Sequence, residues 1–508
     1  MPPKFNIHTS PVPNRFQSIT KSGVIAWEEG CLKCARCVKK DCVYKVYEKR
    51  SLDTRQMLDT LDSECQDCFR CVQNCPNRLI QKGLNPTYKV LGDHYWTPEI
   101  ISSLWFQAET GRIPVSGGGY GGPFSGPGFD AMWTDMSEIV RPTRDGIHGR
   151  EYISTNVDLG RKLMFLEFGP DGSLVSSAPP LVEIPLPVIF DILPWSPPRE
   201  KINLSFLECS KSLGTFTVVR QSDLTPDLEK YLPHIIVHAD EKPEDLHPEL
   251  IKNLRMIEIP DSENAMAVQA MLKGKNQQLV VIIRIPLNAD ASERTLRLAG
   301  QGAEILHLCA DEYGLEGADQ SLFIKERVKE IHLRLVEEGL RDQITIMASG
   351  GIAMAEHMAK LIICGADAIT IDIPLLIAME CRVCRRCKEG IACPVEIDRL
   401  DPAWGSARIK NLMAGWHNQL LEIMGAMGIR EVRRLRGEMG RAMFFEDLEK
   451  EIFATMGNAK SCLKNSSHSE REGKSGAPAK RVVALHEEGA TGNPLAGVPV
   501  KAQKGLSQ

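Results

Sequence analysis

Twelve of the sixteen cysteines in this chain fall into three short runs with the spacing of metal-cluster ligands. The first run has the pattern C-x2-C-x2-C-x4-C and holds Cys31, Cys34, Cys37 and Cys42. The second has the pattern C-x2-C-x2-C-x3-C-P and holds Cys65, Cys68, Cys71 and Cys75. The third has the pattern C-x2-C-x2-C-x5-C-P and holds Cys381, Cys384, Cys387 and Cys393. Thiolates in such runs hold iron-sulfur clusters, so we predict three [4Fe-4S] clusters.

The first two runs together have the arrangement of a two-cluster ferredoxin, in which the fourth cysteine of each run ligates the other cluster. By position, one cluster would use Cys31, Cys34, Cys37 and Cys75, and the other would use Cys65, Cys68, Cys71 and Cys42. The alternative for each run is structural zinc, which is also bound by four thiolates. Three cysteines at three-residue spacing, with Cys-Pro at the end of two runs, favour clusters.

The composition describes a large globular chain in a reducing compartment. With 508 residues, of which 43% are hydrophobic and 25% charged, the chain is long enough for more than one domain. A net charge of -5 gives no reason to expect nucleic acid or an anionic membrane as a partner. No apolar run reaches the ~20 residues of a membrane span. We expect a cytoplasmic protein without a transmembrane segment, whose partners are redox proteins or other subunits of an electron-transfer complex.

Eight short apolar segments, separated by helical stretches, predict a (β/α)8 TIM barrel in the middle of the chain. They lie at 185–193, 216–219, 234–239, 254–259, 279–285, 303–310, 343–348 and 367–373. A doubly wound sheet is the alternative, but its dinucleotide fingerprint is missing. The predicted domains are an α+β ferredoxin-like domain (1–80), a connector with a glycine-rich segment at 116–128 (81–179), the barrel (180–380), the third run with C-terminal helices (381–458), and a disordered tail (459–508).

Polar residues at the strand ends are the candidates for chemistry, because active sites of such barrels gather at the carboxyl ends of the strands. Arg284, His307, Asp311 and Glu312 are the catalytic candidates. Other polar residues at these ends are Asp191, His238, Asp240 and Glu258. Such a group could move protons or bind an anionic substrate, or it could be a satisfied hydrogen-bond network. The turn Ser349-Gly350-Gly351 offers backbone amides that could hold a phosphate, with tight turns as the alternative.

The segment from LRDQITIMASGG through CPVEI resembles the FMN-binding barrel of glutamate synthase, in which a Gly-Gly turn, a Gly-Ala-Asp strand start and a cysteine cluster follow in this order. The resemblance extends from about residue 105 to about residue 440. It implies FMN on the barrel, with Ser349, Gly350, Gly351 and Gly365 as cofactor residues, and an iron-sulfur cluster beside it. Cys384 adds a fourth cysteine to the three of glutamate synthase, which favours [4Fe-4S].

The chain also departs from this family, and three functions follow. DILPWSPP replaces the Met-Ser-Phe-Gly-Ala stretch, the Gly-Glu-Gly-Gly loop is missing, and Asp372 and Pro374 stand at the end of strand eight. The first hypothesis is an oxidoreductase or redox subunit that passes electrons between the clusters and an FMN-type site. The second is a ferredoxin-dependent glutamate synthase that receives ammonia from a partner. The third is a non-catalytic cluster relay and scaffold whose barrel has lost the flavin.

Overall fold

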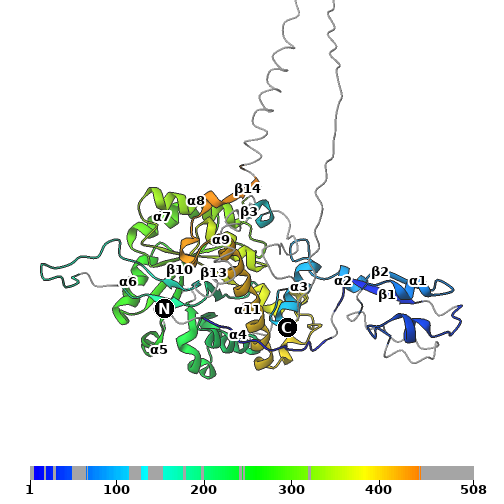
Figure 1. Ribbon diagram of the computed structural model, residues 1–508. Coiled ribbons are helices and arrows are strands. Elements are labelled where there is room, and N and C mark those ends of the chain that lie inside the picture. The colour runs from blue at the N-terminus through cyan, green and yellow to red at the C-terminus, as the bar shows by residue number, and fades with distance from the viewer. Residues whose placement is uncertain are drawn as a thin grey trace, which may run out of the picture. The chain divides into compact units, whose positions relative to one another are not determined.

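The computed structural model of the chain contains a closed barrel of eight parallel strands (Figure 1). The strands are β6 (Val188–Phe190), β7 (Thr217–Arg220), β8 (Ile235–His238), β9 (Met256–Pro260), β10 (Val280–Pro286), β11 (Ile305–Cys309), β12 (Thr345–Ser349) and β13 (Ala368–Ile371). Each strand lies within or overlaps one of the eight apolar segments, so the predicted (β/α)8 barrel is confirmed. The structure describes residues 5–16, 19–26, 30–47, 65, 67–113, 128–134, 153–175, 179–195, 200–239, 243, 246–317, 322–445 and 447.

Helices surround this barrel because its strands are apolar on both faces and must be covered on the outside. The helices between and after the strands are α4 (Glu200–Leu213), α5 (Pro248–Asn253), α6 (Ala265–Lys275), α7 (Ala291–Gln301), α8 (Ile324–Glu337), α9 (Ala355–Cys364) and α10 (Ile373–Ala378). Strand residues such as Ile236, Ile257 and Ile282 are fully buried. The barrel therefore forms a core from which the loops at the strand ends project.

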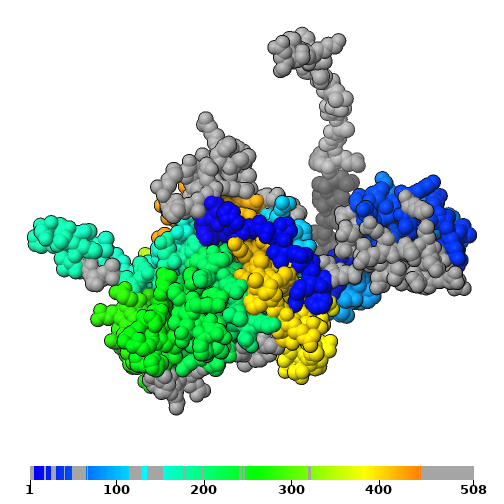
Figure 2. Space-filling view, turned by 90° about the horizontal axis from the view of Figure 1, so that it is seen from below, coloured from blue at the N-terminus to red at the C-terminus, as the bar shows by residue number. Residues whose placement is uncertain are grey.

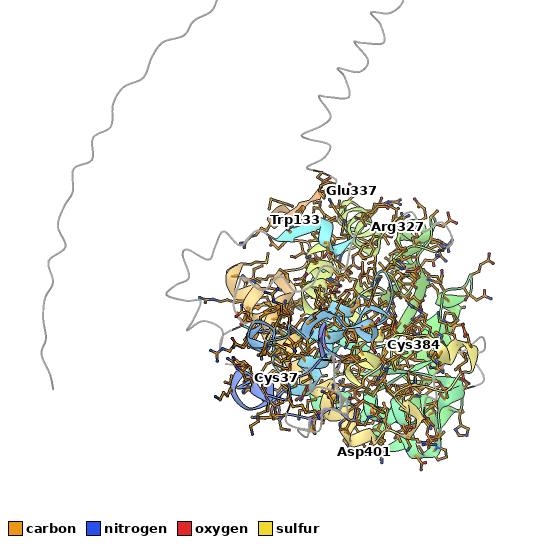
Figure 3. The ribbon with its side chains drawn as sticks, turned by 90° about the vertical axis from the view of Figure 1, so that its right-hand side faces the viewer. Cys37, Trp133, Arg327, Glu337, Cys384 and Asp401 are labelled. Carbon is orange, nitrogen blue, oxygen red and sulfur yellow. The ribbon has the colours of Figure 1, made fainter. Side chains whose placement is uncertain are left out.

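A long helix, α11 (Pro402–Ala426), follows the third cysteine run and packs against α4, α9 and α3 (Pro98–Thr110). Asp401, labelled in Figure 3, caps its first turn by accepting a hydrogen bond from the backbone of Ala403. Residues 5–16 run along α3 and α11, where Arg408 donates to the carbonyl oxygen of Val12. This N-terminal segment therefore packs against helices of the barrel domain.

The first two cysteine runs lie in the chain between the two strands of a small antiparallel sheet, β1 (Ser22–Ala26) and β2 (Ile80–Leu84). A helical turn at Cys37–Asp41 follows one run's third cysteine, and α1 (Arg70–Asn74) includes the other's. The amide of Asn74 donates to Asp41 at 3.0 Å and joins the two turns. This is the expected α+β arrangement, although its second strand runs four residues past the predicted boundary at residue 80. The short helix α2 (Pro86–Lys89) leads away from it.

Two further small sheets complete the described part of the chain. One pairs β3 (Met132–Thr134) with β14 (Ala442–Phe444), and the other pairs β4 (Val157–Leu159) with β5 (Val182–Ile184). No helix among the described residues has the length and apolarity needed to span a membrane. The predictions for the glycine-rich segment up to residue 127, for Asp240 and for the tail 459–508 lie outside the described residues.

Candidate functional site

The three cysteine runs have the same unusual backbone conformation. In every run, both neighbours of the second cysteine are left-handed, with φ between 52° and 58°: Lys33 and Ala35, Asp67 and Phe69, Val383 and Arg385. The third residue after the fourth cysteine is left-handed as well: Lys45, Arg78 and Glu396. With Glu380, which stands next to Cys381, these make up all the non-glycine residues with positive φ in the described part of the chain.

Each of these conformations costs about 1–2 kcal/mol for a residue with a side chain, so they persist only where the surroundings require them. Their effect is to curl the backbone around the sulfur atoms. The amide of Val383 donates to the Sγ atom of Cys381 at 3.4 Å, and the amide of Leu79 donates to that of Cys75 at 3.3 Å. Amides aimed at sulfur favour the thiolate, which is the form that ligates a cluster.

The thiols of the first two runs lie close to one another. Burial raises the pKa of Cys71, and Cys65 and Cys42 raise it further, so Cys42 of the first run lies beside cysteines of the second. Tyr47, which no sequence motif indicated, hydrogen-bonds to the same thiol. Burial raises the pKa of Cys381 to about 12, with contributions from its neighbours Cys393, Cys384 and Cys387. A bound metal reverses such shifts by deprotonating its ligands.

The third run lies against the carboxyl ends of the barrel strands. Arg385 pairs with Glu312, which follows β11, at 3.3 Å, and it also pairs with Asp93. The guanidinium of Arg385 and the ammonium of Lys388 both lie 5.4 Å from the ring of Trp195, which follows β6. Figure 3 labels Cys384 of this run. The third set of thiols therefore borders the barrel mouth, where the sequence order had indicated it.

Inside the mouth, side chains from different strands form one buried network. Arg284 of β10 makes a two-pronged ion pair with Asp191, at 2.8 and 3.0 Å, and it reaches Glu258 of β9 at 3.1 Å. Nδ1 of His307 lies 2.6 Å from Glu258, and its Nε2 lies 2.9 Å from the hydroxyl of Thr370. Thr370 in turn donates to Asp191 at 3.1 Å. Opposite sides of the barrel are thus joined through its centre.

The charges of this network balance one another. Burial works to raise the pKa of both Asp191 and Glu258, but Arg284 and His307 hold both carboxyl pKa values below their usual range. Burial disfavours the imidazolium of His307, yet Cys309 and Glu258 raise its pKa to about 10. Two carboxylates then face one guanidinium and one imidazolium, so the group is neutral as a whole. His238 adds a further contact to Glu258 at 2.8 Å.

The four catalytic candidates do not come together. Arg284 and His307 share the buried network, whereas Asp311 holds the loop after β11 by accepting from the amides of Tyr313 and Leu315. Glu312 faces the third cysteine run instead of the barrel centre. Sequence reasoning did not single out Thr370, and the one signal for it is that it is the polar residue of the otherwise apolar and buried strand β13.

Comparison with known proteins agrees with this architecture. The family model described as the conserved region in glutamate synthase matches residues 258–430. The archaeal glutamate synthase (NADPH) of Archaeoglobus fulgidus is 24% identical, covering 85% of this chain and 96% of the relative. The archaeal glutamate synthase (NADPH) of Methanocaldococcus jannaschii is 25% identical over 89% of this chain and 97% of the relative. The chain is therefore similar to archaeal glutamate synthases over most of its length. An archaeal-type glutamate synthase (NADPH) of Dehalococcoides mccartyi is 23% identical over 81% of this chain.

In this barrel, the residues expected to hold a flavin phosphate have other contacts. The hydroxyl of Ser349 lies 3.1 Å from Nε2 of His307 and so points into the barrel. A Cβ atom on Gly350 would come within 2.6 Å of the carbonyl oxygen of Asp311, which shows that the turn packs tightly on the loop after β11. Gly365 ends α9, before β13 begins, and a Cβ atom there would overlap His332. It therefore lies at the opposite end of the strand from the mouth.

The end of β13 does not fit a flavin phosphate. The carboxylate of Asp372 accepts the amide of Ile373 at 2.6 Å and so takes the first free amide of α10. Pro374, the next residue, has no amide to offer. Burial raises the pKa of Asp372 to about 7, so its carboxyl is about half ionised at neutral pH, and in its ionised form it would repel a phosphate dianion. The FMN implied by the resemblance therefore lacks half of its expected phosphate site.

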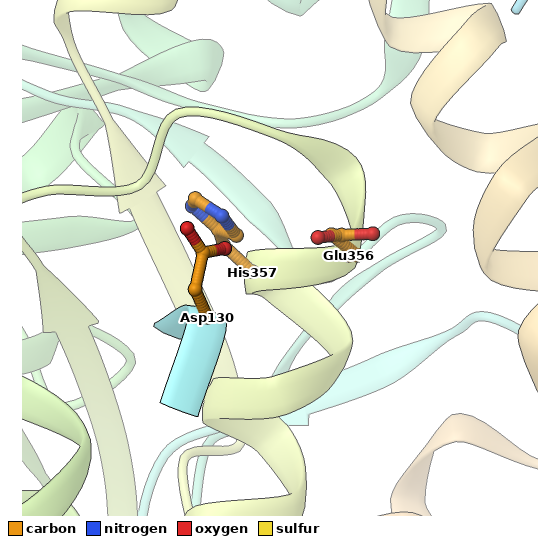
Figure 4. Close-up of side chains that lie close together, drawn as sticks. All are labelled: Asp130, Glu356 and His357. Atoms are coloured by element: carbon orange, nitrogen blue, oxygen red, sulfur yellow. The ribbon is translucent and has the colours of Figure 1, made fainter. Parts of the chain in front are cut away.

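A second group of polar side chains lies at the start of α9, where Asp130, Glu356 and His357 approach one another within metal-binding range (Figure 4). Burial lowers the pKa of His357, so its ring is neutral, and its Nδ1 accepts from the amide of Ala353 at 3.1 Å. The ring proton is then on Nε2, the nitrogen that would have to bind a metal. Lys360 lies 3.7 Å from Glu356 and supplies the positive charge. We do not assign a metal to this group.

Proposed function

We propose that this chain is an iron-sulfur oxidoreductase, or the redox subunit of a larger complex, that passes electrons through three [4Fe-4S] clusters. Two clusters would lie in the ferredoxin-like part, on the crossed ligand sets, and the third at the barrel mouth on Cys381, Cys384, Cys387 and Cys393. The partners would be redox proteins or other subunits in the cytoplasm, where thiols stay reduced and available for metal.

The left-handed backbone shared by the three runs carries this proposal. Three segments with different sequences adopt one conformation at the same positions relative to their cysteines, and those positions are energetically unfavourable in the absence of a ligand. A structural zinc site closes a tetrahedron of thiolates and has no need for three cysteines on one curled loop. The third run matches the other two although its last spacing is longer, which supports a cubane there as well.

Anaerobic purification followed by iron, sulfide and zinc analysis tests the proposal. Three cubanes require about twelve irons and about twelve sulfides per chain, with broad visible absorption that bleaches on reduction. Stoichiometric zinc with little iron would overturn the proposal. About eight irons would restrict it to the ferredoxin-like part.

Glutamate formation is the second candidate, because the relatives are named glutamate synthases and match most of their length to this chain. Its test is the formation of glutamate from 2-oxoglutarate and ammonia by the chemically reduced protein. Reduced clusters without any glutamate would remove this candidate and leave electron transfer intact.

An FMN-type site is favoured by the Gly350-Gly351 turn at the end of β12 and opposed by Asp372. Acid extraction of the purified protein, followed by flavin fluorescence, decides between the two. We expect less than stoichiometric FMN, because the Asp372 carboxyl occupies the amide of Ile373 and Pro374 has no amide to offer. A full equivalent of tightly bound FMN would contradict this expectation and restore the flavin-linked form of the proposal.

A further inference from the structure

A β-hairpin at residues 163–175 projects from the barrel domain as a turquoise finger in Figures 1 and 2. Phe168 and Leu174 face each other across its two arms in a β-bridge. The amide of Val175 donates to the carbonyl oxygen of Glu167 at 2.8 Å, and the amide of Gly169 donates to that of Ser173 at 2.8 Å. The hairpin is therefore an ordered element with internal hydrogen bonds.

This hairpin is unusually apolar for a projecting element. Seven of its side chains are large, hydrophobic and 38–75% exposed: Leu163, Met164, Phe165, Leu166, Phe168, Leu174 and Val175. Together they expose roughly as much surface as four whole side chains, on the order of 600 Å². The largest apolar patch on a typical monomer is about 300–600 Å², and one side of a standard protein interface is about 800 Å². The hairpin alone provides most of one such side.

The base of the hairpin is attached to the barrel at the end opposite the third cysteine run. The amide of Lys162 donates to the carbonyl oxygen of Gln343 at 2.8 Å, and Gly160 exchanges hydrogen bonds with the hydroxyl of Thr345, the first residue of β12. Arg161 reaches the carbonyl oxygens of Ala299 and Ala303, just before β11. A protein bound to the hairpin would therefore leave the barrel mouth and the third set of thiols accessible.

We propose that the hairpin is the contact between two copies of this chain. Its exposed area is close to what each side of a stable dimer buries, and depletion of charge is typical of such permanent interfaces. In a dimer with a two-fold axis, both copies use the same surface, which here is the apolar hairpin. The two hairpins would lie side by side and point in opposite directions. Glu167 and Asp171 near the tip then approach Arg161 and Lys162 at the base of the partner hairpin, so opposite charges meet.

The charges also argue against a lipid surface as the occupant. Between residues 163 and 175 the hairpin carries two carboxylates, Glu167 and Asp171, and no lysine or arginine. Elements that dock on anionic membranes combine apolar residues with basic ones. The acidic tip would be repelled by such a surface, whereas a second hairpin offers it basic groups.

The oligomeric state of the complete, cluster-loaded protein tests the inference. Sedimentation velocity and light scattering at micromolar concentration should give twice the mass of one chain for the wild type. The double variant Phe165→Asp, Phe168→Asp should sediment as a single chain, because each copy would place two carboxylates in an apolar contact. Both side chains are exposed, so iron content and far-ultraviolet circular dichroism should not change.

Val90→Asp is the matched control, since Val90 is as exposed as Phe165, at 75%, and lies on another element. It should leave the dimer intact. A monomeric wild type, or a dimer that survives the double variant, overturns the inference. Co-sedimentation of monomeric wild type with phosphatidylglycerol vesicles would also overturn it and make lipid the occupant. If the double variant loses iron, Leu166→Lys, which changes one exposed side chain, repeats the test.

Discussion

The cysteine runs and the barrel mouth differ in how their reactive side chains are satisfied. Among the described cysteines of the three runs, none is fully buried, and the backbone around them is held in left-handed turns that are costly for residues with side chains. In the mouth, Asp191, Glu258, Arg284 and His307 satisfy one another inside the barrel. The thiols of the runs therefore remain at least partly accessible. The mouth, in contrast, is already closed by the chain's own side chains.

This difference between paired charges and accessible thiols indicates which of the two regions is free to bind a ligand. A buried ion-pair network that is neutral and hydrogen-bonded gains nothing from an anionic substrate, because each charge already has its counter-charge. Strained loops of thiols gain their stability from the metal they bind. We therefore place the proposed redox function in the three cysteine runs.

The largest effect should come from breaking the third run. Cys387→Ser removes one ligand of that set, so the iron content should fall from about twelve to about eight per chain, while the two ferredoxin-type clusters remain. Iron analysis and electron paramagnetic resonance of the reduced protein measure the change. Cys309→Ser, at an isolated cysteine, is the control and should keep all the iron. Loss of all the iron in Cys387→Ser would mean that the three sets do not assemble independently.

The buried network of the barrel mouth can be disrupted at Glu258, which accepts hydrogen bonds from Arg284, His307 and His238. Glu258→Gln leaves two buried cations without their shared counter-charge, which should lower the free energy of unfolding of the barrel by about 3–5 kcal/mol. Denaturant unfolding followed by tryptophan fluorescence measures this. Glu249→Gln breaks an exposed pair with Lys252 and should cost less than about 1 kcal/mol. Equal effects for both variants would show that the network contributes little.

The pH dependence of stability should distinguish the mouth from the runs. The pKa of His307 is raised to about 10 from an unfolded value of 6.5, so its stabilising contribution is complete below pH 6.5. That contribution should be lost progressively as the pH rises from about 6.5 to about 10. Melting temperatures between pH 7 and pH 9.5 should therefore fall in the wild type, and the fall should be shallower in His307→Gln. Parallel curves would indicate that His307 is neutral in the folded protein.

The smallest effect concerns the attachment of the third run to the N-terminal segment. Arg15 pairs with Glu380, the neighbour of Cys381, at 3.2 Å and donates to the carbonyl oxygen of Val395 at 2.8 Å. Arg15→Met should lower stability by about 2 kcal/mol and speed chelator-driven loss of the third cluster alone. Lys21→Met, which breaks an exposed pair with Glu99, is the control. Uniform loss of all three clusters would argue against a local role for Arg15.

Much of this molecule could be predicted from its sequence, because the decisive signals are local. Eight apolar segments predicted eight barrel strands, since burial on both faces leaves a continuous hydrophobic run. Cysteine spacing grouped the thiols, since three ligands of a cubane come from one short loop. The left-handed turns around Cys34, Cys68 and Cys384 were not predicted, because the residues that adopt them are not glycines.

Only the tertiary structure decided how the barrel mouth is filled and which surface is left apolar. The residues of the mouth stand at strand ends up to 179 positions apart, as in the pair of Thr370 and Asp191, and sequence does not say which charge meets which. The same holds for Arg15 and Glu380, 365 residues apart. The apolar residues of segment 163–175 do not reveal in the sequence whether they are buried. Only the fold shows that they are exposed. Local spacing thus determined which thiols are grouped, and long-range packing determined which charged side chains meet inside the barrel mouth.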